Sequence, residues 1–227
     1  MCLVIFDIDG TLTDTMEVDA TCFVRALAEA CGLSNIDADW SRYKHATDAG
    51  IFNEIFGVRV GRLPTADEIS RFHKHFMTLL ASAAKERPFT AVAGASRMLM
   101  LLGDRGHYKI SLATGCWRDS ARLKMTSAGM PYDDYPSASC DDALERDSII
   151  KLSMHKAMKS FGGPFASTVY VGDGVWDARA CREIGIPFIG IGAGVRAKRL
   201  AAEGAVAVLR DFSESDLFLN HLESIAP

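Results

Sequence analysis

The chain begins MCLVIFDIDGTLTD (residues 1–14), and this stretch decides the fold. Residues 1–6 form an apolar run rich in β-branched and aromatic side chains, which is typical of a buried strand. A strand this apolar suits the centre of a parallel sheet that is covered on both faces. The run stops abruptly at the polar residues 7–14, so we expect a carboxylate-bearing loop at the carboxyl end of the strand, where ligands bind in such sheets.

The first two acids of this loop have two interpretations. Asp7 and Asp9 are two residues apart, so in an extended segment both side chains point the same way, and Gly10 lets the backbone approach a ligand. Two carboxylates beside open backbone suit a hard cation. The same residues are also common in an ordinary polar turn. The stretch by itself therefore predicts either a cation site or a plain turn.

Length and composition are those of a globular protein. The 227 residues are 48% hydrophobic, enough for one large or two modest domains. The net charge of −4 provides no basic field for a polyanion, so we expect no nucleic-acid partner. The six cysteines are scattered without C-x-x-C spacing and are interpreted as reduced thiols. No stretch resembles a signal peptide or a membrane span, so we expect a cytoplasmic protein with no membrane partner.

Between residues 15 and 87 the pattern is helical. Apolar residues recur at helical spacing over residues 23–30 and again over residues 65–85, where Thr65 and Glu68 form a predicted capping box. Residues 40–61 lie between these helices, are polar and aromatic, and are assigned neither helix nor strand. The stretch contains no convincing strand, so we expect an all-helical insert large enough for a small domain.

From residue 88 onward helix and strand alternate, which indicates a parallel sheet. The predicted strands are 109–113, 136–140, 168–171 and 187–191, and the predicted helices are 94–102, 117–128, 148–161, 177–184 and 213–225. We therefore predict an α/β fold with a Rossmann-like, doubly wound parallel sheet core, formed by residues 1–14 and 88–227. Residues 15–87 are inserted as an α-helical cap domain on two short linkers, either as a lid or as a rigidly packed helical subdomain.

Three of the predicted strands end in polar clusters of small residues. These clusters are residues 7–14, Thr114-Gly115, and GDGVWD at residues 172–177. Each cluster alone is compatible with an ordinary turn or the start of a helix. Because a parallel sheet brings the carboxyl ends of its strands to one edge, we expect the three clusters to form a single site.

These clusters resemble the motifs of the haloacid dehalogenase superfamily, and the resemblance covers essentially the whole chain. Residues 7–13 are similar to the first family motif, D-x-D-G-T-x-T, and Thr114 is similar to the Ser or Thr of the second. Residues 172–177 are similar to the fourth motif, G-D-x-x-x-D. The helical insert is similar to the cap of the branch that contains phosphoglycolate phosphatase and β-phosphoglucomutase. These motifs are specific for the superfamily but not for a substrate.

The third motif is where the chain departs from the commonest family pattern. The family places a Lys, less often an Arg, before the helix that precedes the fourth motif. Two residues qualify here, Arg146 and Lys151. Arg146 has the better register relative to the apolar pair Ile149-Ile150 and is preferred, while a solvated helix charge is the alternative for both.

The resemblance implies that Asp7 attacks the phosphorus atom and forms an aspartyl-phosphate, which divides one hard displacement into two easier ones. It implies that Asp9 protonates the leaving alcohol and later deprotonates the hydrolytic water. Dehalogenase members do not keep this second Asp. Its presence therefore favours phosphoryl transfer over dehalogenation.

The resemblance also implies a Mg²⁺ site, with Asp7, the Asp9 backbone carbonyl and Asp173 as oxygen ligands and Asp177 as an orienting acid. Thr114 and the amide of Gly115, beside Gly10, would hold phosphate oxygens, while Arg146 or Lys151 would offset negative charge. The family's cap specificity loop falls at about residues 45–50. Its polar residues, which are Thr47 and Asp48 together with His45, either reach over the site or lie in solvent.

We therefore predict a Mg²⁺-dependent phosphatase that acts on a small phosphorylated metabolite through an aspartyl-phosphate, as a monomer or small homo-oligomer. A phosphomutase of the β-phosphoglucomutase type, which returns the phosphoryl group to a sugar, is the alternative. A non-catalytic phosphate- or metal-binding protein is the third possibility, and the intact pair of Asp7 and Asp9 argues against it. The sequence does not identify the substrate, because in such proteins the cap makes that choice.

Overall fold

A computed structural model describes residues 1–225 of the chain. Within this range six strands form one parallel sheet, in the order β3-β2-β1-β4-β5-β6. Strand β1 (Cys2–Phe6) lies between β2 (Tyr108–Ala113) and β4 (Ser167–Gly172), and its residues pair in register with both. The outer strands are β3 (Ser137–Ala138), β5 (Phe188–Ile191) and β6 (Ala207–Leu209). The predicted α/β fold with a doubly wound parallel sheet is confirmed.

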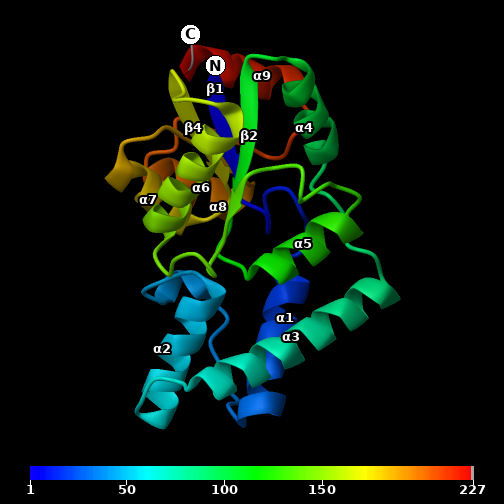
Figure 1. Cartoon of the computed structure of the whole chain (residues 1–227), viewed down its shortest axis with the longest axis vertical. Helices are drawn as coiled ribbons and strands as arrows, with labels where there is room; N and C mark the ends of the chain where they lie inside the picture. Colours follow the sequence, from blue (N-terminus) through cyan, green and yellow to red (C-terminus); the bar gives the residue numbers. More distant parts are fainter. Residues whose placement is uncertain (226–227) are drawn as a thin grey trace.

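Helices cover both faces of the sheet (Figure 1), and the side chains of β1 alternate between these two layers. Leu3 and Ile5 belong to a core cluster shared with α6 (Arg146–Phe161), α7 (Val175–Ile184) and α8 (Gly194–Ala202). Val4 and Phe6 belong to a second cluster on the opposite face, shared with α4 (Ala95–Asp104), α5 (Arg118–Ser127) and α9 (Ser215–Ile225). Because both faces are covered, every residue of β1 is buried, and the strand must be apolar throughout.

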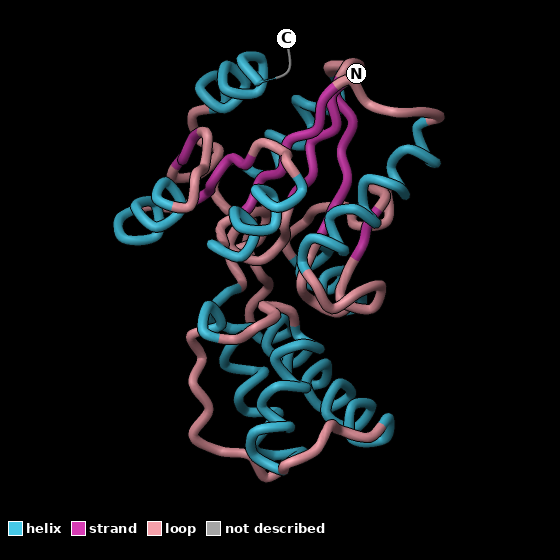
Figure 2. The backbone as a smooth tube through the Cα atoms, turned by 90° about the vertical axis from the view of Figure 1, so that its left-hand side faces the viewer, coloured by secondary structure: helices cyan, strands magenta, loops and turns pink. Residues whose placement is uncertain are grey.

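The segment that the sequence predicts as a cap forms a separate helical layer beyond the carboxyl ends of the strands (Figure 2). It contains α1 (Met16–Cys31), the short 3₁₀ helix η1 (Trp40–Arg42), α2 (Asp48–Val60) and α3 (Ala66–Glu86). Helices α1 and α3 pack together through edge-on contacts of Phe23 with Phe72 and Phe76. The ends of this layer, and so the domain boundaries at residues 14 and 88, stay a prediction.

The predicted helices and strands occur where the sequence places them, within a few residues. The capping box of α3 is present, with Thr65 and Glu68 each accepting a backbone amide of the other. Helix α2 was missed within residues 40–61, because it contains two glycines and is apolar on more than one side: Ile51 and Phe52 are buried while Val58 is exposed. Strand β6 was missed because three residues are too few to show a period.

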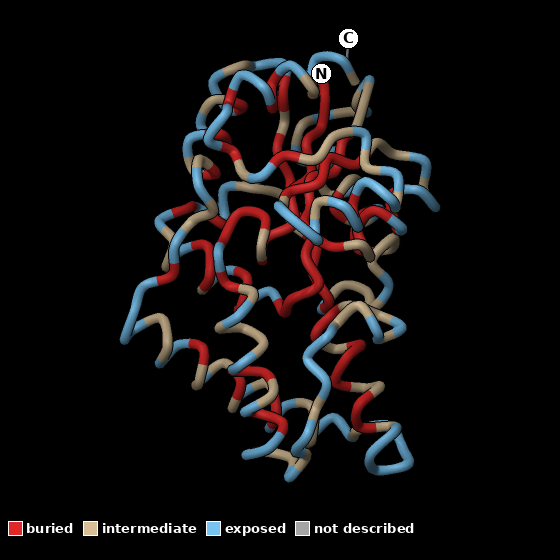
Figure 3. Tube along the Cα trace, turned by 180° about the vertical axis from the view of Figure 1, so that it is seen from behind, coloured by how far each residue is buried: buried red, intermediate tan, exposed pale blue. Residues whose placement is uncertain are grey.

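Burial follows the layers (Figure 3). The strands of the sheet are mostly buried, and most helices present one buried and one exposed face. Among the helices of residues 1–225, none combines the length and the apolar character that crossing a membrane requires.

Candidate active site

The loop after β1 positions the first acids. The Asp7 amide donates to the carbonyl of Val171 at 2.9 Å, so Asp7 extends the β1–β4 ladder to the edge of the sheet. The carbonyl of Ile8 then accepts amides from the next turn, which closes a tight loop. Gly10 has φ of +72°, and a Cβ there would lie 2.1 Å from Oδ2 of Asp173. Gly10 is therefore the residue that lets the first motif approach the fourth.

The three polar strand ends meet, as the sheet topology requires. Ligand oxygens of Asp7, Asp173 and Asp177 all lie within 4.8 Å of one another, and all three residues are buried. A small cavity of about 50 Å³ adjoins Asp7 and Asp173. Its lining also includes five other predicted site residues: Asp9, Asp48, Thr114, Gly115 and Arg146.

Arg146, not Lys151, lies in this site. As the first residue of α6, Arg146 places Nε 2.7 Å from Oδ1 of Asp177 and Nη2 3.4 Å from Oδ1 of Asp7, with only 9% of its side chain exposed. Lys151 is 58% exposed and pairs with Asp147 on the same helix at 2.8 Å. The structure does not bring Lys151 to the predicted substrate site. Lys151 lies about 1.4 helical turns after Arg146 on α6, and its side chain points to solvent.

The two acids of the fourth motif have different surroundings. Asp177 is fully buried, and its oxygens are engaged by Arg146, by the Tyr170 hydroxyl at 3.2 Å and by the Gly174 amide at 3.3 Å. Asp173 pairs through Oδ2 with Nη1 of Arg196 at 2.8 Å, while its buried Oδ1 has no hydrogen-bond partner. Asp173 is therefore the acid with an oxygen free for a ligand, and Asp177 orients Arg146.

The donor set fits a hard divalent cation. Asp7 and Asp173 offer carboxylate oxygens, and the orphaned Oδ1 of Asp173 lacks only a positive partner. The side chain of Asp9 is turned away toward Lys124, which leaves its backbone carbonyl as its contribution to such a site. Oxygen ligands of this kind, without His or Cys, are those that Mg²⁺ prefers.

Asp7 and Asp9 are electrostatically distinct. Burial raises the pKa of Asp7 well above its usual value, with Asp177 and Asp173 adding to the effect and Arg146 opposing it. Burial would also raise the pKa of Asp9, but the Lys124 ammonium and hydrogen bonds from Cys116 and Thr15 outweigh it, so the pKa of Asp9 is lowered. Environments that separate two neighbouring carboxyl groups are typical of sites that use both in catalysis.

The cap loop docks on the second motif. The Asp48 amide donates to the Gly115 carbonyl at 2.8 Å, the Trp117 amide donates to Oδ2 of Asp48 at 3.0 Å, and the Thr47 hydroxyl donates to the Leu144 carbonyl at 3.1 Å. A Cβ on Gly115 would lie 2.7 Å from the Ala46 carbonyl, so this approach needs glycine. Thr47 and Asp48 are thus buried against the core and are not in solvent.

Comparison with known families agrees with this arrangement. The family model described as a haloacid dehalogenase-like hydrolase matches residues 1–185, which include the ends of β1, β2 and β4. The chain belongs to this family.

Related proteins match this hydrolase over almost its whole length. A Dickeya dadantii protein named "Probable phosphatase IndB" is 27% identical over 221 residues, covering 93% of this chain and 90% of that protein. A hydrolase from Pseudomonas syringae has a similar solved structure, with a TM-score of 0.77, 22% identity and full coverage of both chains. A predicted phosphoglycolate phosphatase from Haemophilus somnus has a TM-score of 0.69 and 16% identity, with 96% and 97% coverage. At such identities the two structures establish the fold alone.

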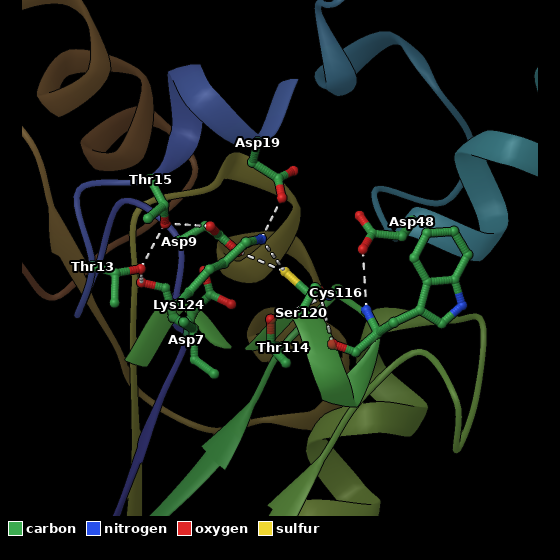
Figure 4. Close-up of polar contacts among 12 residues, drawn as sticks. Asp7, Asp9, Thr13, Thr15, Asp19, Asp48, Thr114, Cys116, Ser120 and Lys124 are labelled. Atoms are coloured by element: carbon green, nitrogen blue, oxygen red, sulfur yellow. Dashed lines mark hydrogen bonds and ion pairs between the residues drawn. The ribbon is translucent and has the colours of Figure 1, made fainter. Parts of the chain in front are cut away.

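Sequence reasoning missed three residues of this hydrolase's site. Lys124, on α5, is fully buried, with Nζ 2.9 Å from Oδ2 of Asp9 and 3.2 Å from Sγ of Cys116. It also forms an ion pair with Asp19 of α1 (Figure 4). The Cys116 thiol donates to Oδ2 of Asp9 at 2.6 Å. No spacing signals this cluster, because a lysine within a polar helix is usually solvated and Asp19 lies in a different element.

The acidic cluster makes the stability of the metal-free hydrolase dependent on pH. Burial, with Asp177 and Asp9 nearby, raises the pKa of Asp173 to about 7 despite Arg196. The folded state therefore binds more protons than the unfolded state between pH of about 4 and 7, so stability falls as pH rises through this window. We expect a loss of up to about 4 kcal/mol in the free energy of unfolding.

Urea unfolding with a chelator present, at a series of pH values, measures this effect. Asp173→Asn should have a shallower slope than the wild type and be the more stable protein at pH 7, while the part of the slope that comes from Asp7 and Asp48, whose pKa values burial also raises, remains. Asp104→Asn, which changes an exposed acid at the end of α4, should keep the wild-type slope. Parallel wild-type and Asp173→Asn curves would show that Asp173 does not carry the effect.

Proposed function

We propose that the chain is a Mg²⁺-dependent phosphatase that hydrolyses a small phosphorylated metabolite through an aspartyl-phosphate on Asp7. The observation that carries this proposal is the arrangement of Asp7 and Asp9 in one cavity with different partners. Asp7 faces Arg146 and the acid cluster, whereas Asp9 is held by Lys124, Cys116 and Thr15. One carboxylate is thus placed for attack and the other for proton transfer.

In the first step an Asp7 oxygen forms a bond to phosphorus while the bond from phosphorus to the ester oxygen breaks. The leaving alkoxide takes a proton from Asp9. Although Asp9 is acidic in the free protein, an incoming phosphate dianion raises its pKa, which loads the proton when substrate binds. In the second step Asp9 takes a proton from water, the water oxygen attacks phosphorus, and the bond to Asp7 breaks.

The remaining residues bind and orient the phosphoryl group. Thr114, buried at the end of β2, and the neighbouring Gly115 amide would donate to phosphate oxygens. Arg146, held by Asp177, would offset charge on the phosphate and on Asp7. Mg²⁺ held by Asp7, the Asp9 carbonyl and Asp173 would supply further positive charge against the phosphate.

The cap would exclude water during these steps. The cavity of about 50 Å³ is lined by cap residues such as Trp40 and Asp48 as well as by core residues, and it is not fully enclosed. In this proposal the contacts between residues 46–48 and the core open to admit substrate and close to exclude water. We also propose that the enzyme is cytoplasmic and acts as a monomer or small homo-oligomer. Its six free thiols support the cytoplasmic location.

The test is phosphate release from a panel of phosphorylated metabolites, with Mg²⁺ and with a chelator. We expect release with Mg²⁺ and a loss of at least about 100-fold when the metal is removed, because charge stabilisation supplies much of such catalysis. Equal release in both conditions would contradict metal dependence. Formation of an isomerised sugar phosphate without free phosphate would establish the phosphomutase instead.

A further inference from the structure

The two sides of the cavity differ in charge. Thr114, Gly115 and Arg146 line the side where the phosphate would bind. The cap lines the opposite side, where the leaving alcohol would lie, with two acids and several apolar residues: Asp19, Asp48, Met16, Phe23, Trp40 and Ile51. Among the described residues that line this cavity, Arg146 is the one with a cationic side chain. The leaving-group side is therefore acidic and aromatic.

Asp48 is an acid without a counter-charge. Asp19 has an ion pair with Lys124, but none of the ion pairs within residues 1–225 involves Asp48, which is only 7% exposed. One of its oxygens accepts the Trp117 amide, and the other has no hydrogen bond to the described part of the chain (Figure 4). Burial and the nearby Asp19 raise the pKa of Asp48 well above its usual value, although Lys124 opposes this shift, so a ligand ammonium group beside Asp48 would stabilise its charged form.

Aromatic side chains complete the environment. Phe23 and Trp40 line the cavity from the cap, and their rings pack edge to face with centroids 5.5 Å apart. Trp176 lines the cavity from the start of α7. Aromatic faces attract ammonium groups, and an unpaired carboxylate beside them adds a direct charge partner. This combination suits a cation and repels an anion.

We propose that the preferred substrate is the phosphate monoester of a short amino alcohol, whose protonated amine pairs with the free oxygen of Asp48. The inference rests on the proposed phosphatase function and adds the chemical class of the leaving group. A leaving group with a second anion, such as a carboxylate or another phosphate, would face Asp19 and Asp48 without a cation to receive it. Phosphoglycolate and sugar bisphosphates are therefore disfavoured.

Bulky side chains favour a short alcohol, because Phe23, Trp40 and Trp176 line a cavity of only about 50 Å³. These tryptophans also line a neighbouring cavity of about 400 Å³. The cationic side chains of that cavity, Lys44, Arg146 and Arg179, are matched in number by the acids Glu145, Asp147 and Glu183, so it offers no strong site for a second anion.

Three esters of similar size test the proposal: 2-aminoethyl phosphate, propyl phosphate and phosphoglycolate. We expect kcat/KM to fall in that order, by at least about tenfold from the first to the second. Asp48→Asn keeps an acceptor for the Trp117 amide and removes the charge. We expect it to lower kcat/KM for the amino ester about tenfold or more and to change the value for propyl phosphate much less. Asp67→Asn, an exposed acid on α3 of the cap, should preserve the wild-type order.

The outcomes separate the two proposals. Hydrolysis of p-nitrophenyl phosphate without a preference for the amino ester would overturn this inference alone. An equal loss for all three esters in Asp48→Asn would also overturn it and would make Asp48 a docking residue only. If the wild type releases phosphate from neither p-nitrophenyl phosphate nor the three esters, the phosphatase function fails and this inference fails with it.

Discussion

Asp7→Asn is expected to lower kcat for phosphate release by about 10⁴-fold or more, the scale seen when a nucleophile is removed. Asparagine preserves the size of the side chain and the packing at the end of β1 but cannot form the phosphorus bond. Arg146 would keep its pair with Asp177 at 2.7 Å and lose only the acid at 3.4 Å, so it could still bind the phosphate. We therefore expect KM to change much less than kcat.

The measurement is steady-state phosphate release, together with mass spectrometry of rapidly quenched enzyme. Wild-type protein should carry a phosphoryl group on Asp7, and Asp7→Asn should carry none. Asp14→Asn is the matched control, because Asp14 ends the same loop but is exposed. Wild-type turnover in Asp7→Asn, or a phosphoryl group on another residue, would contradict the assignment of the nucleophile.

Much of this site could be predicted because the residues that build it follow buried strands. A parallel sheet takes the carboxyl ends of β1, β2 and β4 to one edge, so Asp7, Thr114 and Asp173 must lie together once the strands are recognised. The choice of Arg146 over Lys151 also depended on local register, since only the first residue of α6 points at that edge. Strand ends and helix starts are properties that a single sequence shows.

Contacts between separate elements could not be predicted in this way. Lys124 contacts Asp9 and Asp19 only because α5 and α1 pack beside the first motif. The spacing of these three residues along the sequence follows no recognisable motif. The docking of Asp48 on the Gly115 loop likewise depends on how the cap is oriented. An ion pair of this kind produces no repeating pattern in the sequence, because it depends on a single residue in each of two separate elements.

The loop after β2 contacts the cap through its backbone. The Gly115 carbonyl accepts a hydrogen bond from the Asp48 amide, while the Gly115 amide is the group that would donate to a phosphate oxygen in the proposed function. Trp117, two residues later, stacks on Phe23 of α1 and also contacts Phe72 of α3, so the same loop is held by the cap's own core. In the proposed phosphatase, a phosphate bound to this loop would favour cap docking and so link substrate binding to the exclusion of water.

Lys124→Met is expected to have the second largest effect, because it removes the buried cation from two buried acids. Burial alone would lower the pKa of Lys124, but Asp19 and Asp9 raise it well above its usual value, so the side chain stays charged. Breaking such a pair from one side costs about 3–5 kcal/mol. Asp9 would also lose the donor at 2.9 Å that orients it, so we expect kcat to fall about 100-fold or more.

Chemical unfolding and steady-state kinetics together separate these two losses. Adding Asp19→Asn to Lys124→Met removes one of the stranded acids, so the double variant should regain part of the stability but little of the kcat. Lys151→Met is the control, since its exposed pair with Asp147 contributes only about 0–1 kcal/mol. If Lys124→Met does not fold, the double variant and Lys124→Arg provide the comparison. Wild-type stability and kcat in Lys124→Met would refute the proposed positioning of Asp9, because a buried cation that can be removed without cost cannot be holding the acid in place.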